Sequence, residues 1–346
     1  MAKRLDGLLG VLNGAVGDYL ARTDNGLATP MQLIHRGAPL PVDRAALAEA
    51  HPHATGRVVV LLPGIMCTET VWQLPRTAAS ATRPDGAPAT DYGAMLARDL
   101  GFTPLYLRYN TGLAIPDNGA SLAALLESLV GEYPAPLTEI LLLGFSMGGL
   151  VARSACHVAH QRGQHWLRLV RRAIYLGTPH RGAPFERLGR TVARLLQSVD
   201  DPVTRLLADI ANLRSDGVKD LGDADLRHED RARRTPTVGL RDPAHPVALL
   251  PQIEHYLVAG TLSPAPWLAA LFGDTLVPLG SATDGAVPEL AGAELPAGHV
   301  KVVPGLAHLT LAHHSAVYAH IRSWCEPDTA LGDKSSAAQA NDSASR

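Results

Sequence analysis

The stretch "LLLGFSMGGLVARSA", residues 141–155, places a serine between glycines directly after a run of aliphatic residues. Residues 144–148, "GFSMG", match the pattern G-x-S-x-G, in which the serine occupies a strained turn between a buried strand and a helix. The residues two positions from the serine must lack bulk, because the strand and helix backbones pass close to them. We therefore predict a strand that ends at Ser146, a helix that follows it, and a serine that stands above the edge of a sheet.

Strand-like apolar runs alternate with helical patterns on both sides of this turn. Strands are expected at residues 57–65, 102–110, 138–146, 171–180, 254–262 and 298–305, and helices at 91–101, 118–133, 147–161 and 314–325. Such alternation is typical of a mostly parallel sheet with helices on both faces. The fold class that we predict is therefore α/β, with a mostly parallel central sheet.

The alternation stops between residues 183 and 250, where two amphipathic patterns are punctuated by arginines. We predict that residues 183–250 form a helical insertion over the sheet, a cap or lid. This insertion divides a core of residues 55–182 and 251–325. Residues 1–54 are expected to form an N-terminal helical extension. Residues 326–346, rich in Ala, Ser and Asp, are expected to form a disordered tail.

Composition and charge exclude several classes of protein. The 31 basic and 33 acidic residues give a net charge of -2, which offers no electrostatic footprint for nucleic acid. Cys67, Cys156 and Cys325 have neither metal-ligand spacing nor the density of a disulfide scaffold, so free thiols are expected. No run reaches the roughly 18 apolar residues of a spanning helix. Asp6 and Asp18 interrupt the apolar start and fit a secretory signal poorly, so we expect a cytoplasmic protein.

A base is needed to make Ser146 reactive. A serine hydroxyl is a weak nucleophile until a base removes its proton and a third group orients that base. In chains with this turn the order is Ser, then Asp or Glu, then His, so both partners are expected after residue 180. Five C-terminal histidines compete for the role: His299, His308, His313, His314 and His320. We predict His308, because it follows one expected strand and precedes the last helix, whereas His299 begins a strand and the other three lie in or at the start of the helix.

The acidic partner is expected in "LFGDTLVPLGSATDG", residues 271–285, which follows the strand predicted at 254–262. Asp274 precedes a small apolar cluster that can bury and orient its carboxylate, as a partner of the base requires. Asp284 lies in a turn-like Thr-Asp-Gly, and Asp242 precedes the strand. We favour Asp274 and keep the other two as alternatives.

Acyl transfer also needs hydrogen-bond donors for the oxyanion that develops on the carbonyl group. One donor is expected to be the backbone N–H of Met147, directly after the serine. The other is expected in "LLPGIMC", residues 61–67, where the N–H of Ile65 follows Pro-Gly and that of Met66 is the alternate. The sequence thus predicts an oxyanion hole built from backbone groups alone.

Five segments, in this order, resemble the α/β-hydrolase superfamily and, within it, the bacterial esterases and lipases: "LLPGI", "LLLGFSMGGLVAR", "IYLGTPHRGAP", "GDTLVP" and "GLAHLTL". The resemblance covers roughly residues 55–325. The segment "LGTPHRGAP" is similar to the strand end that leads into the lid of lipase-like members, including the deacylases that act on lipid-linked glycans. "LPGI" departs from the His-Gly that many members have at the oxyanion loop, and the residues before 55 match no motif of the superfamily.

This resemblance implies Ser146 as nucleophile, Asp274 as acid, His308 as base, and Ile65 and Met147 as oxyanion donors. The activity expected is hydrolysis of an ester with an apolar acyl group, through an acyl-enzyme and without a metal or organic cofactor. The partner expected is therefore a small ester or lipid substrate. His180 and His245 lack the partners of a metal site, so a structural role is expected for them.

Other functions remain compatible with the same residues. The predicted triad would also serve an acyltransferase, a thioesterase or an amidase. A catalytically silent protein that binds an apolar ligand is a second alternative. The arginines of the insertion also leave open transient contact with a membrane surface, and the apolar faces of the insertion fit packing on the sheet as well as they fit an acyl pocket.

Overall fold

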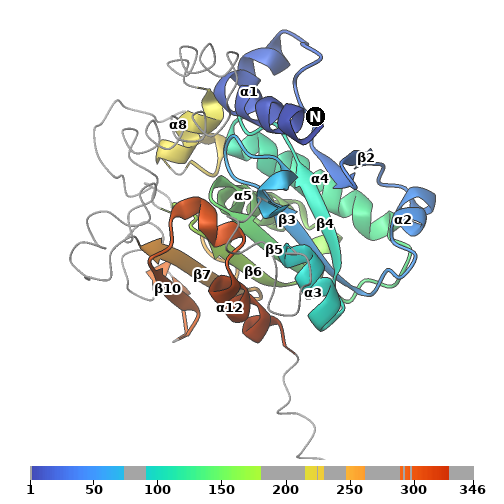
Figure 1. Cartoon of the computed structure of the whole chain (residues 1–346), viewed down its shortest axis with the longest axis vertical. Helices are drawn as coiled ribbons and strands as arrows, with labels where there is room; N and C mark the ends of the chain where they lie inside the picture. The colour runs from blue at the N-terminus through green and yellow to red at the C-terminus, as the bar shows by residue number, and fades with distance from the viewer. Residues whose placement is uncertain are drawn as a thin grey trace, which may run out of the picture.

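An eight-stranded sheet forms the centre of the molecule, with helices on both faces (Figure 1). The computed structural model describes residues 2–73, 91–180, 215–223, 225–229, 247–261, 289–290, 293–296 and 298–326. A short pair of strands, β8 (Glu289–Leu290) and β9 (Ala293–Glu294), forms a separate two-stranded sheet.

The strands of the large sheet follow the order β10-β7-β6-β5-β3-β4-β1-β2. The strands from β10 to β4 run parallel, and their bounds are β3 (Arg57–Leu62), β4 (Thr103–Arg108), β5 (Glu139–Phe145), β6 (Val170–Leu176), β7 (Glu254–Thr261) and β10 (Val300–Pro304). At the far edge, β1 (Gln32–His35) pairs antiparallel with β4, and β2 (Ala38–Leu40) pairs antiparallel with β1. The predicted α/β class with a mostly parallel sheet is thus confirmed.

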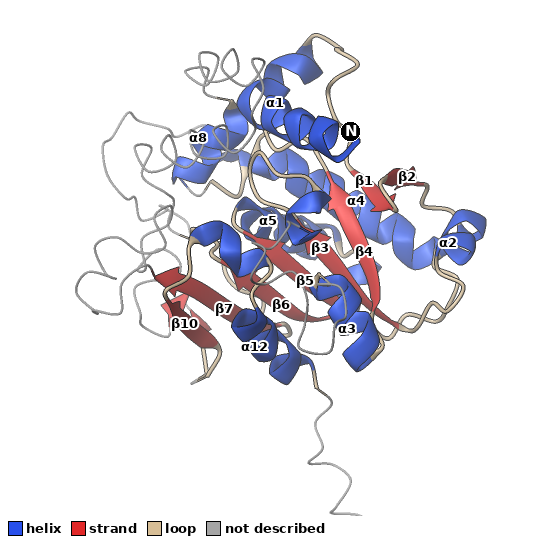
Figure 2. Ribbon diagram, in the orientation of Figure 1, coloured by secondary structure: helices blue, strands red, loops and turns tan. Residues whose placement is uncertain are grey.

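The central strands are buried because helices cover both faces of the sheet. Every residue of β5 is buried, as expected for a strand with no solvent-facing side. Leu142 packs on the face covered by α4 (Ile115–Glu132) and α5 (Met147–Arg162). Leu141 and Leu143 pack on the opposite face, under α3 (Tyr92–Leu100) and α12 (Ser315–Cys325) (Figure 2).

Backbone conformation and one long-range hydrogen bond explain several element boundaries. Helix α3 ends where predicted, because Gly101 adopts the left-handed conformation that closes many helices. Helix α4 begins at Ile115, three residues before the predicted start, since the Asp220 carboxylate accepts the Ile115 N–H at 2.8 Å. Strand β6 ends at Leu176 rather than at residue 180, because Gly177 turns the chain with a φ of 58°.

The N-terminal region is not helical throughout. It contains α1 (Ala2–Arg22) and α2 (Arg44–Ala50), as a helical extension would, but also the strands β1 and β2. These strands are only 4 and 3 residues long, too short for a periodic pattern to reveal them in the sequence. The first residues of the chain therefore extend the sheet as well as covering it.

Part of the predicted insertion is described, and it is fixed to the core. Helix α8 (Asp216–Asp223) lies beside α1 and α4 (Figure 1). The Ser154 hydroxyl donates to the carbonyl oxygen of Leu226 at 2.8 Å, and the Arg153 guanidinium donates to that of Val247 at 2.8 Å. The two amphipathic patterns, which span 192–213, and all but the first residue of the predicted tail lie outside the described residues.

Two expectations from composition can be compared with the structure. All three cysteines of the chain fall in the described part and are free, as predicted. Among the described helices, none combines the length and the apolar character that crossing a bilayer would require.

Candidate active site

Ser146 occupies a strained turn between β5 and α5, where the sequence predicts it. Its backbone has φ 53° and ψ -123°, a conformation that side-chain-bearing residues rarely adopt. The Ser146 N–H donates to the Leu176 carbonyl oxygen of the neighbouring strand at 2.8 Å, and the Ser146 carbonyl accepts from the Gly149 N–H at 3.1 Å. Such strain costs of order 1–3 kcal/mol and is concentrated at functional sites.

Glycines allow the backbones around this turn to approach each other. A Cβ on Gly144 would lie 2.6 Å from the Gly149 Cα, and one on Gly148 would collide with the Leu62 carbonyl oxygen. A Cβ on Gly64, in the chain after β3, would lie 2.9 Å from the Ser146 Cβ. These contacts explain in physical terms why the serine is flanked by small residues.

His308 lies close to the same turn. It begins a 3-10 helix, His308–Ala312, that follows β10, and its side chain is buried. The His308 ring lies 5.0 Å, centroid to centroid, from the ring of Phe145, the residue before the serine. A Cβ on Gly177, which ends β6, would lie 2.9 Å from the His308 Cε1. The carboxyl ends of β5, β6 and β10 thus bring Ser146 and His308 into one region.

The competing histidines occupy other surroundings. His299 precedes β10 and stacks on Tyr256 with 4.1 Å between ring centroids. His314 accepts a hydrogen bond from the Ala316 N–H at the start of α12, and His320 stacks on Trp324 within that helix. Their positions agree with the topological reason for preferring His308.

The Ser146 hydroxyl is buried, and Oγ has no hydrogen-bond partner within the described part of the chain. Buried polar atoms without a partner are rare and call for an explanation such as a functional role. The acidic candidates Asp274, Asp284 and Asp242 all lie outside the described residues, so the choice among them stays a prediction.

The two expected oxyanion donors lie on either side of the serine. Met147 is the first residue of α5, where a backbone N–H has no partner within the helix. Ile65 lies in a turn after β3, residues 63–67, which we call the β3 turn; the Cys67 N–H donates to the Gly64 carbonyl at 3.1 Å and closes it. Within the described part of the chain the Ile65 N–H makes no hydrogen bond. The alternate donor, the Met66 N–H, is already used, since it donates to the Thr111 Oγ1 at 3.0 Å.

A second cluster of titratable groups lies beside α5. The Arg153 Nη1 lies 3.0 Å from the His180 Nδ1, and because an arginine only donates, the imidazole accepts there and carries its proton on Nε2. Burial, followed by the charges of Arg153 and His255, lowers the pKa of His180 well below its usual value. No set of three or more metal-ligating side chains occurs among the described residues, and His245 is outside them.

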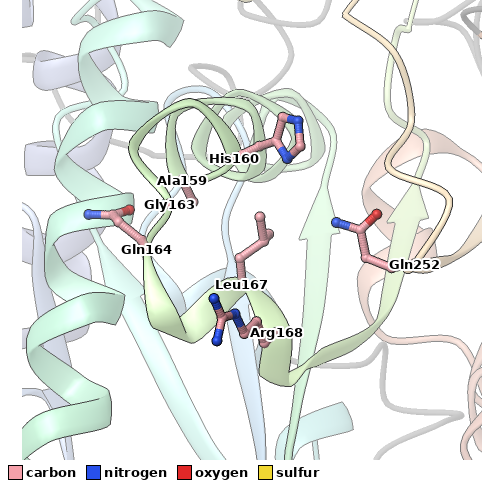
Figure 3. A pocket seen from close by; sticks show the side chains of 7 residues that line it. All are labelled: Ala159, His160, Gly163, Gln164, Leu167, Arg168 and Gln252. Atoms are coloured by element: carbon pink, nitrogen blue, oxygen red, sulfur yellow. The ribbon is translucent and has the colours of Figure 1, made fainter.

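One hollow of the surface is far from Ser146. It has a volume of about 190 Å³ and is lined by Ala159, His160, Gly163, Gln164, Leu167, Arg168 and Gln252 (Figure 3). These residues surround the C-terminal end of α5, whereas Ser146 precedes its first residue. The 16 residues of the helix separate its two ends by about 24 Å. The hollow is therefore not part of the candidate site.

Residues 53–235, more than half of the chain, match the family model described as the PGAP1-like alpha/beta domain. The chain belongs to this family. The PGAP1-like domain is an α/β-hydrolase domain, so the superfamily resemblance noted in the sequence is confirmed. No curated protein sequence matches the chain significantly.

Solved structures similar to this chain include a lipase, an esterase and a thioesterase. The mature form of a lipase from Bacillus licheniformis has a TM-score of 0.47 at 17% identity, covering 78% of this chain and 92% of that one. An esterase from Pyrococcus furiosus has a TM-score of 0.42 at 13% identity, and the match covers 79% of this chain and 85% of that one. A type II thioesterase of the yersiniabactin NRPS/PKS pathway has a TM-score of 0.42 at 14% identity, and the match covers 78% of this chain and 92% of that one. At this distance the activities of these proteins do not transfer to the PGAP1-like chain.

Proposed function

We propose that the protein is a serine hydrolase that cleaves carboxylic esters with an apolar acyl group. The observation that carries the proposal is the position of Ser146. Its strained backbone presents a buried hydroxyl without a partner among the described residues, next to Phe145, whose ring contacts His308. A nucleophile with a base within reach and backbone donors beside it is the arrangement that acyl transfer requires.

In the proposed reaction His308 accepts the proton of the Ser146 hydroxyl while Oγ forms a bond to the ester carbonyl carbon. The N–H groups of Ile65 and Met147 donate to the resulting oxyanion, and each is worth about 100- to 1,000-fold in rate. Collapse of this intermediate breaks the bond to the alcohol oxygen, which takes the proton from His308. Water then attacks the acyl carbon and gives a proton to His308. The bond from the acyl carbon to the Ser146 Oγ breaks, Oγ takes that proton from His308, and the acid and the free serine are released. Asp274 is assigned the role of orienting His308.

The side chains near the serine support an apolar acyl group. Ile65, which follows Gly64 in the β3 turn, and Met147 at the start of α5 are both buried and apolar. Binding sites for small apolar groups are lined mainly by such side chains, with few polar groups to fix the orientation of the ligand. The proposed substrate is therefore an ester with an aliphatic acyl chain or a lipid.

The test is hydrolysis of p-nitrophenyl esters from acetate to palmitate by the wild type and the Ser146→Ala variant. A fluorophosphonate, which bonds to an activated serine with loss of fluoride, is applied to both proteins. We expect turnover and labelling of the wild type and neither in the variant, because the substitution removes the proposed nucleophile. Ser121→Ala, an exposed serine on α4, is the matched control and is expected to behave as wild type.

The outcomes separate the proposal from its rivals. Labelling of Ser146 without ester turnover would replace hydrolysis of simple esters by acyl transfer, thioester cleavage or amide cleavage, and competing acceptors would then identify the product. A wild type that neither turns over esters nor reacts with the phosphonate would overturn the proposal in favour of a silent binding protein.

A further inference from the structure

The β3 turn holds its shape against a local energetic cost. Met66 adopts φ 59°, a left-handed conformation that favours glycine and is unfavourable for a methionine. In a turn closed from the Cys67 N–H to the Gly64 carbonyl, Met66 is the third residue, the position where glycine or asparagine is usual. A conformation of this kind persists only where the surrounding structure enforces it.

The enforcing contacts come from the chain that follows β4. The Tyr109 hydroxyl donates to the Pro63 carbonyl oxygen at 2.8 Å, at the beginning of the β3 turn. The Thr111 Oγ1 accepts from the Met66 N–H at 3.0 Å, near the end of it. Both side chains are almost completely buried, so water does not compete for either bond. The two hydrogen bonds bracket Gly64 and Ile65, the residue whose N–H faces the oxyanion in the proposed mechanism.

Helix α1 closes the β3 turn from the other side. A Cβ on Gly14 would lie 2.9 Å from both the N and the Cα of Met66, so no larger residue fits between helix and turn. The Asn110 side chain donates to the Gly17 carbonyl oxygen at 2.8 Å and fastens the helix to the segment after β4. Met66 is therefore held between α1 and Thr111.

An ion-pair network fixes the same helix at its start. The Arg108 guanidinium contacts the Asp6 carboxylate of α1 at 3.0 Å and donates to the Glu69 carboxylate, two residues beyond the β3 turn, at 2.7 Å. Hydrogen bonding with Glu69 raises the pKa of Arg108. The N-terminal helix, which matches no motif of the superfamily, is thus tied to both sides of the turn.

We propose that Tyr109 and Thr111, together with Gly14 of α1, are positioning residues that hold the β3 turn so that the Ile65 N–H points at the oxyanion. This inference rests on the proposed function, because it concerns a donor of that reaction. In the proposed reaction none of these three residues touches the reacting atoms. They act through the backbone of residues 64–66, and removing them is expected to lower the rate of the chemical step rather than the binding of substrate.

The first experiment compares Thr111→Val with Thr111→Ser and with Thr103→Val. The Thr103 Oγ1 also accepts a backbone N–H, that of Thr55, at 3.0 Å, but lies at the opposite end of β4. For Thr111→Val we expect kcat on the best p-nitrophenyl ester to fall at least about 10-fold. The upper limit is the fall of about 100- to 1,000-fold that loss of one oxyanion donor causes. KM is expected to stay within about two-fold of the wild-type value. Thr111→Ser keeps the acceptor and is expected to restore kcat, while Thr103→Val lowers stability and leaves kcat unchanged.

A second pair of variants tests the helix. Gly14→Ala and Gly7→Ala make the same change on α1, but a Cβ on Gly7 meets nothing within 4 Å. Both variants gain helix propensity, so only the contact with Met66 distinguishes them. Gly14→Ala is expected to lower kcat as Thr111→Val does, and Gly7→Ala is expected to match the wild type. A third pair tests the Tyr109 hydroxyl. Tyr109→Phe removes the hydrogen bond to the Pro63 carbonyl, and its control, Tyr318→Phe, removes the hydrogen bond to Asp99.

Amide hydrogen exchange of the peptide that covers residues 57–68 gives a readout independent of activity. Exchange at Met66 is expected to accelerate in Thr111→Val and Gly14→Ala and to stay unchanged in Thr103→Val and Gly7→Ala. Equal exchange and equal kcat in test and control variants would overturn the inference while leaving the proposed hydrolase intact. If the wild type is inactive on every ester, the proposed function fails. Faster exchange at Met66 in Thr111→Val and Gly14→Ala would then still support enforcement of the β3 turn by these residues. Unchanged exchange in both variants would overturn that enforcement.

Discussion

The ring of His308 lies 5.0 Å from the ring of Phe145, centroid to centroid, although 162 residues, 146–307, separate the two in the sequence. The contact exists because β5 and β10 end at the same edge of a parallel sheet, with β6 and β7 between them. It places the candidate base beside the residue that precedes the candidate nucleophile. Four predictions about single residues follow, and the first two concern this edge.

The end of β6 is expected to control the position of His308. Gly177→Ala places a Cβ 2.9 Å from the His308 Cε1 at a backbone φ of 58°, so it should both strain the chain and displace the ring. Gly101→Ala is the matched control, since Gly101 has φ 69° and nothing within 4 Å of the added atom. Both variants should lose about 1 kcal/mol or more of stability to backbone strain. Only Gly177→Ala should lose ester hydrolysis, and equal activity in the two variants would contradict the placement of His308.

The turn at Ser146 is expected to tolerate no side chain at Gly148. A Cβ there meets the carbonyl oxygens of Leu62 and Pro63, which are backbone atoms and cannot move aside. Gly148→Ala should therefore destabilise the protein by several kcal/mol, on the order of 2–4. Thermal and urea denaturation measure the change. Gly131→Ala, in α4 with open space around it, is the control and is expected to be neutral or slightly stabilising. Similar denaturation midpoints for the two variants would contradict the close packing of the turn around Gly148.

Acid is expected to destabilise the protein through His255, whose Nδ1 lies 3.0 Å from the Tyr175 hydroxyl. Burial lowers the pKa of His255 from 6.5 to about 4. The unfolded chain therefore takes up a proton near pH 6.5 while the folded protein resists until about pH 4, so the free energy of unfolding falls as the pH drops through this window and does not change above it. The loss from this residue is at most about 3 kcal/mol.

Urea denaturation at several pH values between 7.5 and 4 measures this dependence. His255→Gln should reduce the acid-induced loss without abolishing it, because the buried His180 acts in the same direction. His53→Gln, at an exposed position, is the control and should retain the wild-type dependence. A slope that His255→Gln leaves unchanged would remove His255 as a cause.

The contact between the insertion and α4 is expected to contribute to stability. Asp220 of α8 is completely buried and accepts the Ile115 N–H at the start of α4. Asp220→Ala leaves that N–H without its acceptor and should cost about 1–3 kcal/mol, whereas Asp220→Asn keeps an acceptor and should cost less. Asp117→Ala removes an exposed acidic group from the same helix turn and is expected to cost less than about 1 kcal/mol. Thermal denaturation of the three variants gives the comparison, and equal losses for Asp220→Ala and Asp117→Ala would contradict a specific contact.

Much of the fold could be predicted from the sequence, because buried parallel strands leave a strong local pattern. The strands β3, β5 and β7 read as nearly unbroken apolar runs, and the glycines around Ser146 mark the turn between β5 and α5. The edge strands β1 and β2 were missed, since short strands at the margin of a sheet carry little apolar periodicity. The acidic partner of His308 remains a prediction from sequence, with Asp274 preferred.

The candidate site also has features that the sequence predicts and features that only the tertiary structure reveals. By itself the sequence determined that Ser146 would occupy a strained turn and that His308 would follow a strand, because the spacing of glycines and the succession of strands and helices along the chain are local properties. Only the tertiary structure decided that the Met66 N–H is taken by Thr111 and that α1 closes the β3 turn. Those contacts join segments about 45 residues apart or more, through single hydrogen bonds and close backbone approaches that leave no periodic trace in the sequence.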